Sequence, residues 1–323
     1  MNTRKNIAIL AGGDSSEFSV SIKSATLVEA NLSHKYNTFI IVIQGGDWSY
    51  SKDGTTVAID KNDFSLTLNE DKLFFDLAFI AIHGTPGEDG KLQGYFDMLG
   101  IKYSSAGLLT SALSFNKGVC NDYLKNHGIN VAKSIQLFKG LTYNTEKIIS
   151  ELGLPCFVKP NQAGSSYGVS KVGILEELPQ AITDAFVHDK QVLIESFLDG
   201  REVTCGVHNF NGVITEMPIT EIITENDFFD FEAKYKGESN EITPADLPDD
   251  VRISVQTAAK EVYQLLNMKA VARMDFIIQN GEPFLIEANT VPGLSAESLI
   301  PQQAIAMGYT LPDFFVEWVE NCL

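Results

Sequence analysis

Positive charge is what this sequence has least of. Its 323 residues include 24 Lys and Arg against 42 Asp and Glu, which gives a formal net charge of −18. Nucleic acids and anionic membrane surfaces attract cationic proteins, so a chain this acidic is a poor candidate for binding either. A small anionic ligand is not excluded, because a few cations gathered in one place can still hold it. We therefore expect no nucleic acid and no membrane among its partners.

Long apolar segments and closely spaced cysteines are also missing. No apolar run approaches the ~18 residues of a membrane span. The run 7–11 is too short for a signal peptide and is soon followed by Asp14 and Glu17, so we expect a first strand there. The four cysteines lie far apart without metal-ligand spacing, which predicts reduced thiols and a cytoplasmic protein.

Two common phosphate-binding motifs, the P-loop and Gly-x-Gly-x-x-Gly, are absent, so any phosphate site must be built in another way. Residues 164–168 do match the Gly-x-Ser-x-Gly pattern of serine hydrolases. That motif needs a helix directly after the serine, whereas residues 169–172 have the pattern of a strand. A flexible glycine- and serine-rich hairpin is the favoured interpretation.

Hydrophobic residues at 44% and charged residues at 20% indicate a globular protein, and the length predicts two or three domains. Near the N-terminus, strands are expected at 6–11, 38–43 and 76–82, with a helix at 16–32. This order predicts a parallel sheet, whose ligands bind at the carboxyl ends of its strands.

The rest of the chain alternates less regularly. One helix is expected across 109–124, and a half-buried strand at 201–208. A long polar loop at 224–248 has the length typical of a lid. The other expected elements are strands near 155–159, 169–172 and 192–195, a helix near 177–187, a helix at 250–266, strands at 271–278 and 284–287, and C-terminal helices.

Two glycine-rich turns carry acidic residues at expected strand ends. Glu17 follows a Gly-Gly turn that allows a ligand close approach, but Asp14-x-x-Glu17 also has capping-box spacing, which leaves a purely structural role open. The turn 83–90 contains His83 and Glu88. It is either a site, with a weak indication of a metal, or an ordinary turn whose acidic residues begin the next helix.

A lysine precedes the glycine- and serine-rich hairpin. An apolar strand ends at Lys159, and the hairpin follows over 160–168. The amides and hydroxyls of such a loop can wrap phosphates, and the lysine adds positive charge. Lys117 offers a second cation. The alternative is a solvated lysine at a strand end.

Two expected strands near the C-terminus carry polar residues inside apolar runs. Arg273 and Asp275 share one face of the first strand, and Glu287 and Asn289 share one face of the second. Unpaired buried charges are costly, so these residues need partners. Oxygen ligands suit Mg²⁺ bound together with substrate phosphates. The alternative is a buried ion pair of Arg273 with Asp275 or Glu287.

Taken together and in order, five segments resemble the D-alanine–D-alanine ligases of the ATP-grasp superfamily. They are Gly-Gly-x-Ser-x-Glu-x-x-Val-Ser (12–21), His-Gly-x-x-Gly-Glu-Asp-Gly-x-x-Gln-Gly (83–94), Lys-Pro-x-x-x-Gly-Ser-Ser-x-Gly (159–168), Glu-Ala-Lys-Tyr (232–235) and Glu-Ala-Asn-Thr-x-Pro-Gly-Leu-Ser-x-x-Ser-Leu (287–299). The resemblance implies an α/β (α+β) ATP-grasp fold. A Rossmann-like parallel-sheet domain at 1–105 would precede a central domain at 106–195 and a catalytic domain at 196–323, with the lid loop at 224–248.

The resemblance also implies a reaction and its residues. ATP would phosphorylate one D-alanine, and the amine of a second would attack the D-alanyl phosphate, giving D-alanyl-D-alanine for peptidoglycan synthesis. The implied catalytic residues are Glu17, Ser165, Tyr235, Arg273 and Gly293. The implied ATP contacts are Lys117, Lys159, Ser165, Ser166, Glu195, Phe197, Leu198 and Glu202. The implied amino-acid contacts are Glu17, His83, Lys234, Ser298 and Leu299.

The metal ligands implied by the resemblance are Asp275, Glu287 and Asn289, which would hold two Mg²⁺ ions, with Mn²⁺ as a substitute. Tyr235 matches the branch of the family that uses D-alanine, which favours dipeptide synthesis over the D-Ala–D-lactate depsipeptide. The alternative is another ATP-grasp carboxylate–amine ligase, which would make D-Ala–D-Ser or D-Ala–D-lactate. A homodimer in the cytoplasm is implied as well.

Overall fold

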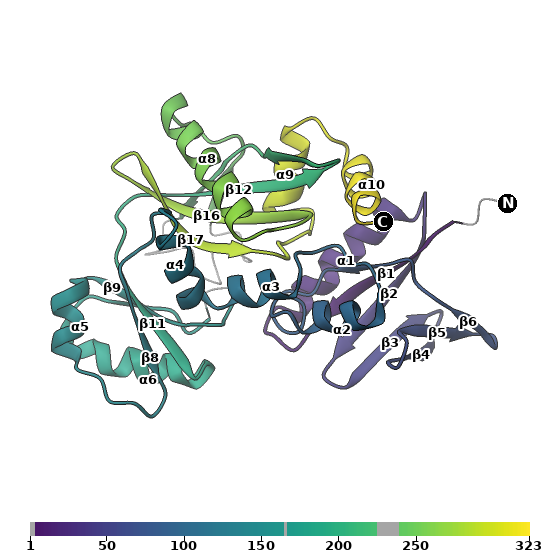
Figure 1. Cartoon of the computed structure of the whole chain (residues 1–323), viewed down its shortest axis with the longest axis horizontal. Coiled ribbons are helices and arrows are strands. Elements are labelled where there is room, and N and C mark those ends of the chain that lie inside the picture. Colours follow the sequence, from purple (N-terminus) through teal and green to yellow (C-terminus); the bar gives the residue numbers. More distant parts are fainter. Residues whose placement is uncertain (1–3, 165–166, 225–238) are drawn as a thin grey trace.

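A computed structural model describes residues 4–164, 167–224 and 239–323. These residues build three β-sheets with helices packed on them (Figure 1). The N-terminal sheet lies at the right of the view, the central sheet at the lower left, and the third sheet above and between them. The described residues that are predicted to form the site lie where these three units face one another.

The first sheet has the strand order β6-β5-β4-β3-β2-β1-β7. Its strands are β1 (Asn6–Gly12), β2 (Asn37–Gln44), β3 (Asp47–Lys52), β4 (Thr55–Asp60), β5 (Ser65–Leu68), β6 (Asp71–Leu73) and β7 (Leu77–Ile80). The predicted parallel pairing is confirmed for β1 with β2 and β7. From β2 to β6 the sheet continues as antiparallel hairpins, which the sequence analysis did not predict.

Helices cover both faces of the parallel strands. Alternate residues of β1 belong to two cores: Ile7 and Ile9 pack with α1 (Phe18–Leu32) and α10 (Leu311–Cys322), and Ala8 and Leu10 pack with α2 (Lys91–Leu99). Burial on both faces explains why these strands are continuous apolar runs. It also fixes the carboxyl ends of β1 and β7, where Glu17 and His83 follow.

The single helix predicted across 109–124 is wrong, because two helices occupy this segment. They are α3 (Leu108–Phe115) and α4 (Lys117–Lys125). Asn116 between them has extended backbone angles, and its side chain accepts a hydrogen bond from Val119 N at 3.1 Å. An asparagine cap of this kind starts a new helix. It turns Lys117 toward the central sheet.

The central sheet is antiparallel, in the order β10-β9-β11-β8. Its elements are β8 (Ser134–Phe138), α5 (Thr145–Leu152), β9 (Cys156–Pro160), β10 (Ser170–Val172), a short 3₁₀ turn at Leu175–Glu177, α6 (Leu178–His188) and β11 (Gln191–Ser196). Val158 and Ile194 face the core under α5 and α6. Alternation along the strands therefore directs Phe157, Lys159 and Glu195 to the opposite face.

The third sheet has the order β15-β14-β12-β16-β17, with β13 paired to β12. Its elements are β12 (Arg201–Phe210), β13 (Val213–Glu216), β14 (Thr220–Thr224), β15 (Ser239–Ile242), α8 (Asp249–Leu265), β16 (Val271–Gln279), β17 (Glu282–Asn289) and α9 (Leu299–Ala306). The strand predicted at 201–208 is confirmed as β12, but its half-buried pattern is wrong, because residues 203–208 are buried without interruption. The predicted loop 224–248 contains β15, so its described part is not all loop.

The sequence predicts that the chain has no membrane span and that its cysteines are reduced. Within the ranges that the structure describes, no helix is both long and apolar enough to cross a bilayer. All four cysteines are free thiols, and burial raises the pKa of the Cys120 thiol to about 12.

His208 on β12 is a buried histidine in an aromatic cluster. Its ring lies 4.2 Å from the Phe210 ring and close to Tyr309 and Phe314, and neither ring nitrogen has a hydrogen-bond partner among the described residues. Burial lowers the pKa of His208 from 6.5 to about 4. Between pH 6.5 and about pH 4, His208 therefore binds a proton in the unfolded chain but not in the folded chain. The free energy of unfolding falls as the pH is lowered through this range.

We accordingly expect His208→Phe to remove part of the acid sensitivity of folding. Between pH 6.5 and pH 5 the wild type should lose up to about 2 kcal/mol through this group. Urea unfolding at the two pH values measures the loss, with His34→Phe at an exposed position as the control. An unchanged pH dependence in His208→Phe would contradict this assignment.

Candidate active site

The candidate active site is a cavity of about 1140 Å³ between the three units. Its walls include every predicted site residue that the structure describes. These are Glu17, His83, Lys117, Lys159, Glu195, Phe197, Leu198, Glu202, Arg273, Asp275, Glu287, Asn289, Gly293, Ser298 and Leu299. The predicted residues Ser165, Ser166, Lys234 and Tyr235 lie outside the described residues.

The third sheet presents its polar residues to this cavity as cross-strand neighbours. Asp275 on β16 lies opposite Glu287 on β17, and Arg273 lies opposite Asn289. Arg273 donates two hydrogen bonds of 2.8 Å to the carboxylate of Asp275. Asn289 and Thr204 donate to the same carboxylate at 3.0 and 2.7 Å. The ion pair left open by the sequence is therefore present, and Asp275 is held rigidly.

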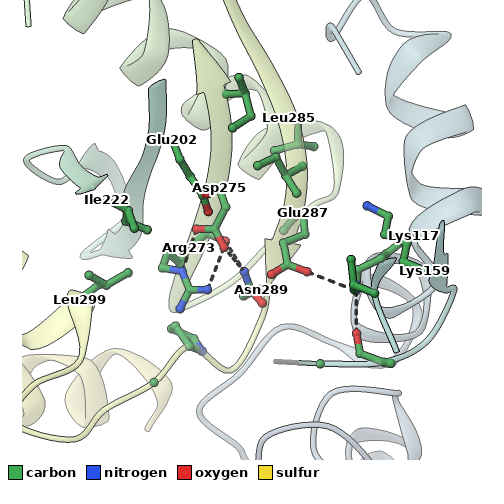
Figure 2. A pocket seen from close by; sticks show the side chains of 18 of the residues that line it. Lys117, Lys159, Glu202, Ile222, Arg273, Asp275, Leu285, Glu287, Asn289 and Leu299 are labelled. Atoms are coloured by element: carbon green, nitrogen blue, oxygen red, sulfur yellow. Dashed lines mark hydrogen bonds and ion pairs between the residues drawn. The ribbon is translucent and has the colours of Figure 1, made fainter. Parts of the chain in front are cut away.

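A divalent cation nevertheless fits this donor set. Glu287 lies between the Arg273–Asp275 pair and the two lysines (Figure 2). Its carboxylate already attracts a cation, because Lys117 Nζ lies 3.2 Å from Glu287 Oε2. No group of three His, Cys, Asp or Glu is gathered in the described ranges. Two carboxylates and an amide oxygen suit Mg²⁺, which commonly takes its remaining ligands from water and substrate phosphates.

The two lysines enter the cavity from the central unit, and acidic residues hold both. Lys159 forms an ion pair with Glu195, whose other oxygen accepts a hydrogen bond from Asn121 at 3.0 Å. Lys117 donates to the Ala163 carbonyl at 2.8 Å. Burial alone would lower the pKa of Lys117, but Glu287 and more distant carboxylates raise it above its usual value. The raised pKa keeps the Lys117 ammonium group charged, and both lysines border the cavity.

Glu17 faces the cavity rather than capping the helix that follows it. The predicted capping box is not among the described contacts. Glu17 occupies the N-cap position of α1, but its side chain makes no hydrogen bond to the helix backbone. The Asp14 carboxylate accepts a hydrogen bond from Gly45 N. Only 8% of Glu17 is exposed. The backbone of Gly164 lies so close that a Cβ there would overlap Glu17 Oε2. Gly164 of the central unit therefore packs directly on a carboxylate of the N-terminal unit.

His83 and Glu88 join the N-terminal unit to the loop after β17. The Nδ1–H of His83 donates to the Val291 carbonyl at 2.9 Å, and its Nε2 accepts from Ser24 Oγ at 3.0 Å. Glu88 accepts from Gly84 N and Val291 N. Burial, with Glu17 nearby, raises the pKa of Glu88 to about 8, and burial lowers the pKa of His83. Through their contacts with Val291, both side chains hold the loop after β17 in place as one wall of the cavity.

The N-terminus of α9 closes one end of the cavity. Ser298 precedes this helix and makes no side-chain cap bond to it. Ser298 Oγ instead accepts from Ser295 N at 3.0 Å. A Cβ on Gly293 would lie 2.9 Å from Ser298 Oγ, so the Gly293 backbone borders the same end. Helix N-termini favour anions such as carboxylates.

Some residues that shape the site were missed by the sequence analysis. Asn161, fully buried, donates to Asn116 Oδ1 and Gln191 Oε1 and accepts from Gly118 N, which ties Lys117 and Lys159 to one network. Thr204 holds Asp275 from the neighbouring strand. Its place two residues after Glu202, on the same face of a strand, is a signal that could have found it.

A methyl group on Gly164 is expected to separate the hairpin from Glu17. Overpacking of this kind commonly costs about 1–3 kcal/mol, so Gly164→Ala should lower kcat/KM about tenfold or more. Gly173→Ala is the matched control, because a Cβ there meets nothing closer than 3.9 Å. The assay is ADP release under identical conditions. Equal kcat/KM values for the two variants would contradict the packing of the hairpin on Glu17.

Comparison with known proteins gives the same family across nearly the whole chain. The family models described as "D-ala D-ala ligase N-terminus" and "D-ala D-ala ligase C-terminus" match residues 6–106 and 123–320. A D-alanine–D-alanine ligase from Flavobacterium johnsoniae is 51% identical over 99% of each chain. One from Parabacteroides distasonis is 48% identical over 98% of this chain and 97% of its own.

Solved structures agree with this fold. The chain is similar to D-alanyl-alanine synthetase A from Vibrio cholerae, with a TM-score of 0.89 and 28% identity over 100% and 99% of the two chains. A D-Ala:D-Ser ligase from Enterococcus faecalis has a TM-score of 0.86 and 28% identity over 99% and 100%. A D-alanine–D-alanine ligase from Bacillus anthracis, solved with ATP, has a TM-score of 0.80 and 30% identity over 98% and 97%.

Proposed function

Because the chain belongs to the D-alanine–D-alanine ligase family, we infer that it joins two D-alanines at the expense of ATP. We also propose roles for the predicted site residues. Full-length identity near 50% to ligases of this specificity supports the dipeptide as product. It disfavours a D-Ala–D-Ser or D-Ala–D-lactate product. D-alanyl-D-alanine is a precursor of peptidoglycan, so the enzyme serves cell-wall synthesis.

We propose that ATP lies between the central and third sheets. The Phe197 and Leu198 backbone would hold the adenine beside the Phe157 ring, which lies 6.1 Å from the Phe197 ring. Glu202 would hold the ribose. Lys117 and Lys159 would contact the phosphates, with Ser165 and Ser166 in the hairpin over them. Glu195 would bind the adenine, and its ion pair with Lys159 would also keep that lysine in place.

The first D-alanine would bind at the junction of the hairpin and the N-terminal unit. Glu17 would bind its ammonium group, and His83 would shape the wall behind it. The carboxylate of this D-alanine attacks the γ-phosphorus, ADP leaves, and D-alanyl phosphate forms. Lysine charge is needed here because nucleophile and phosphate are both anions. Ser165 and Tyr235 would complete a hydrogen-bonded triad with Glu17.

The second D-alanine would bind at the N-terminus of α9. Ser298 and Leu299 would receive its carboxylate, together with Lys234. Its amine attacks the acyl carbon, and inorganic phosphate leaves with the former carboxylate oxygen. Arg273 and the Gly293 amide would stabilise the oxyanion of the tetrahedral intermediate, which is a large catalytic contribution in acyl transfer. A closed lid would exclude water, which otherwise hydrolyses acyl phosphates.

Asp275, Glu287 and Asn289 would hold two Mg²⁺ ions, with Mn²⁺ as a substitute. Bound there, the metal supplies positive charge that neutralises the ATP phosphates. The chain's own contribution is a rigid donor set, because Arg273, Thr204 and Asn289 all fix the Asp275 carboxylate.

The three sheets support a division into units at 1–105, 106–195 and 196–323. We propose that the enzyme works in the cytoplasm, which the free thiols support, and that it forms a homodimer. The exposed apolar side chains of Met98 and Leu109, on the contacting helices α2 and α3, are consistent with pairing of two copies.

The observation that carries the proposal is the convergence of the described family motifs on one cavity. An ADP-release assay with ATP and Mg²⁺ tests it across D-amino acids and D-hydroxy acids. D-alanine alone should give full activity with one dipeptide per ADP. Greater turnover with another D-amino acid or D-hydroxy acid would contradict the assigned substrate.

A further inference from the structure

Glu241, on the edge strand β15, lines the cavity but has no part in the roles given above. It lies opposite Ile222 on β14, which in turn lies opposite Glu202 on β12. Paired residues of neighbouring strands point to the same face, so Glu241 extends the cavity-facing row. Figure 2 shows Ile222 on the same side of Arg273 as Leu299, away from Lys117 and Lys159.

The carboxylate of Glu241 is fixed at the end of the cavity where α9 begins. Its Oε2 accepts a hydrogen bond of 2.8 Å from Gln302 Nε2, which also donates to the Glu297 carbonyl. Gln302 is one helical turn from Ser298, whose carbonyl its backbone N–H contacts at 3.3 Å. Gln302 therefore joins Glu241 to the proposed subsite of the second D-alanine.

A carboxylate in this position needs a cation. Among the described residues, the hydrogen bond to Glu241 comes from a neutral amide, and no ion pair reaches it. The Arg273 guanidinium is already bidentate to Asp275. Burial raises the pKa of Glu241 although Gln302 and Arg273 lower it. A further acid, Glu297, also lines this region and adds to a local field that favours a positive group.

The reaction brings one cationic group to this place, the ammonium of the second D-alanine, which must lose one proton before the free amine attacks. On the basis of the proposed function, we propose that Glu241 binds the ammonium group of the second D-alanine. The carboxylate thereby selects an amino acid over a hydroxy acid. Ser298 and Leu299 hold the carboxylate of that substrate, and Glu241 holds its amino group near the acyl carbon. A hydroxy acid offers Glu241 only a neutral hydroxyl donor, which gives a weaker contact than an ammonium group.

Glu241→Gln tests this assignment because it keeps the size of the side chain and its bond to Gln302 while removing the charge. Loss of a charge-assisted hydrogen bond should raise the KM of the second D-alanine about 10- to 100-fold. The KM values for ATP and the first D-alanine should change less than about twofold. Glu241→Asp retains the charge and should recover part of the loss. Glu261→Gln, on the exposed side of α8, controls for charge alone.

Hydroxylamine separates the two half-reactions. This uncharged nucleophile traps D-alanyl phosphate as a hydroxamate, with no ammonium for Glu241 to bind. Hydroxamate formation in Glu241→Gln should therefore match the wild type while dipeptide formation falls. An unchanged KM for the second D-alanine, or equal loss of both products, would overturn the assignment and leave the proposed function intact. A wild type that makes no dipeptide would contradict the proposed function itself.

Discussion

Replacing Arg273 by lysine is expected to lower kcat by about 100- to 1000-fold, the usual effect of removing one oxyanion donor, which is the role proposed for Arg273. Arg273 donates two parallel hydrogen bonds to Asp275, and a lysine cannot reproduce this planar pair. The substituted ammonium keeps a positive charge but lies in a different place. The KM for ATP should change only a few-fold, because the proposed adenine contacts and the two lysines lie outside β16. Steady-state kinetics at saturating D-alanine measures both values.

Arg252→Lys is the matched control for this substitution. Arg252 also pairs with an aspartate, Asp249, but on the surface of α8. It should retain nearly full activity, because exposed pairs of this kind contribute little. A kcat for Arg273→Lys within about threefold of the wild type would show that the guanidinium does not act on the developing oxyanion.

Glu287→Gln is expected to abolish most turnover, by at least about 100-fold in kcat/KM, because metal charge stabilises phosphoryl transfer by several kcal/mol. The substitution removes a proposed metal ligand. It also removes the carboxylate that holds Lys117 at 3.2 Å and raises its pKa. Mn²⁺ affinity should weaken in parallel, which electron paramagnetic resonance of free Mn²⁺ measures without any assay of activity.

Glu282 lies at an exposed position on the same strand, so Glu282→Gln is the matched control. It should bind Mn²⁺ and turn over like the wild type. Near-normal activity of Glu287→Gln at saturating Mg²⁺ would refute Glu287 as a metal ligand, whatever its contact with Lys117.

Much of the architecture could be predicted because burial leaves a pattern in the sequence. The runs that became β1 and β7 are apolar on both faces, and both are buried on both faces. The break between α3 and α4 was missed because the apolar spacing continues across it, while one asparagine side chain decides where the second helix starts. The hairpins of β2–β6 did leave a signal. Asp53-Gly54, both with positive φ, is the tight turn that joins β3 to β4.

The site was predictable where chemistry is concentrated in short motifs. Glu17, Lys159, Arg273 and Glu287 each stand in such a motif, and all line one cavity. The residues that hold them were not predictable, because their partners are distant in sequence. Thr204 reaches Asp275 across 71 residues. Contacts of this kind depend on strand register, which alternation alone does not fix.

The transfer of ¹⁸O from substrate to phosphate tests the central claim most directly. D-alanine labelled with ¹⁸O in its carboxylate is incubated with the enzyme, ATP and Mg²⁺, and inorganic phosphate is analysed by mass spectrometry. If the carboxylate attacks the γ-phosphorus and the amine then displaces phosphate, each phosphate carries one ¹⁸O and appears with one ADP and one D-alanyl-D-alanine. Phosphate without the label, formed at the same rate as the dipeptide, would contradict the acyl-phosphate mechanism assigned to this cavity.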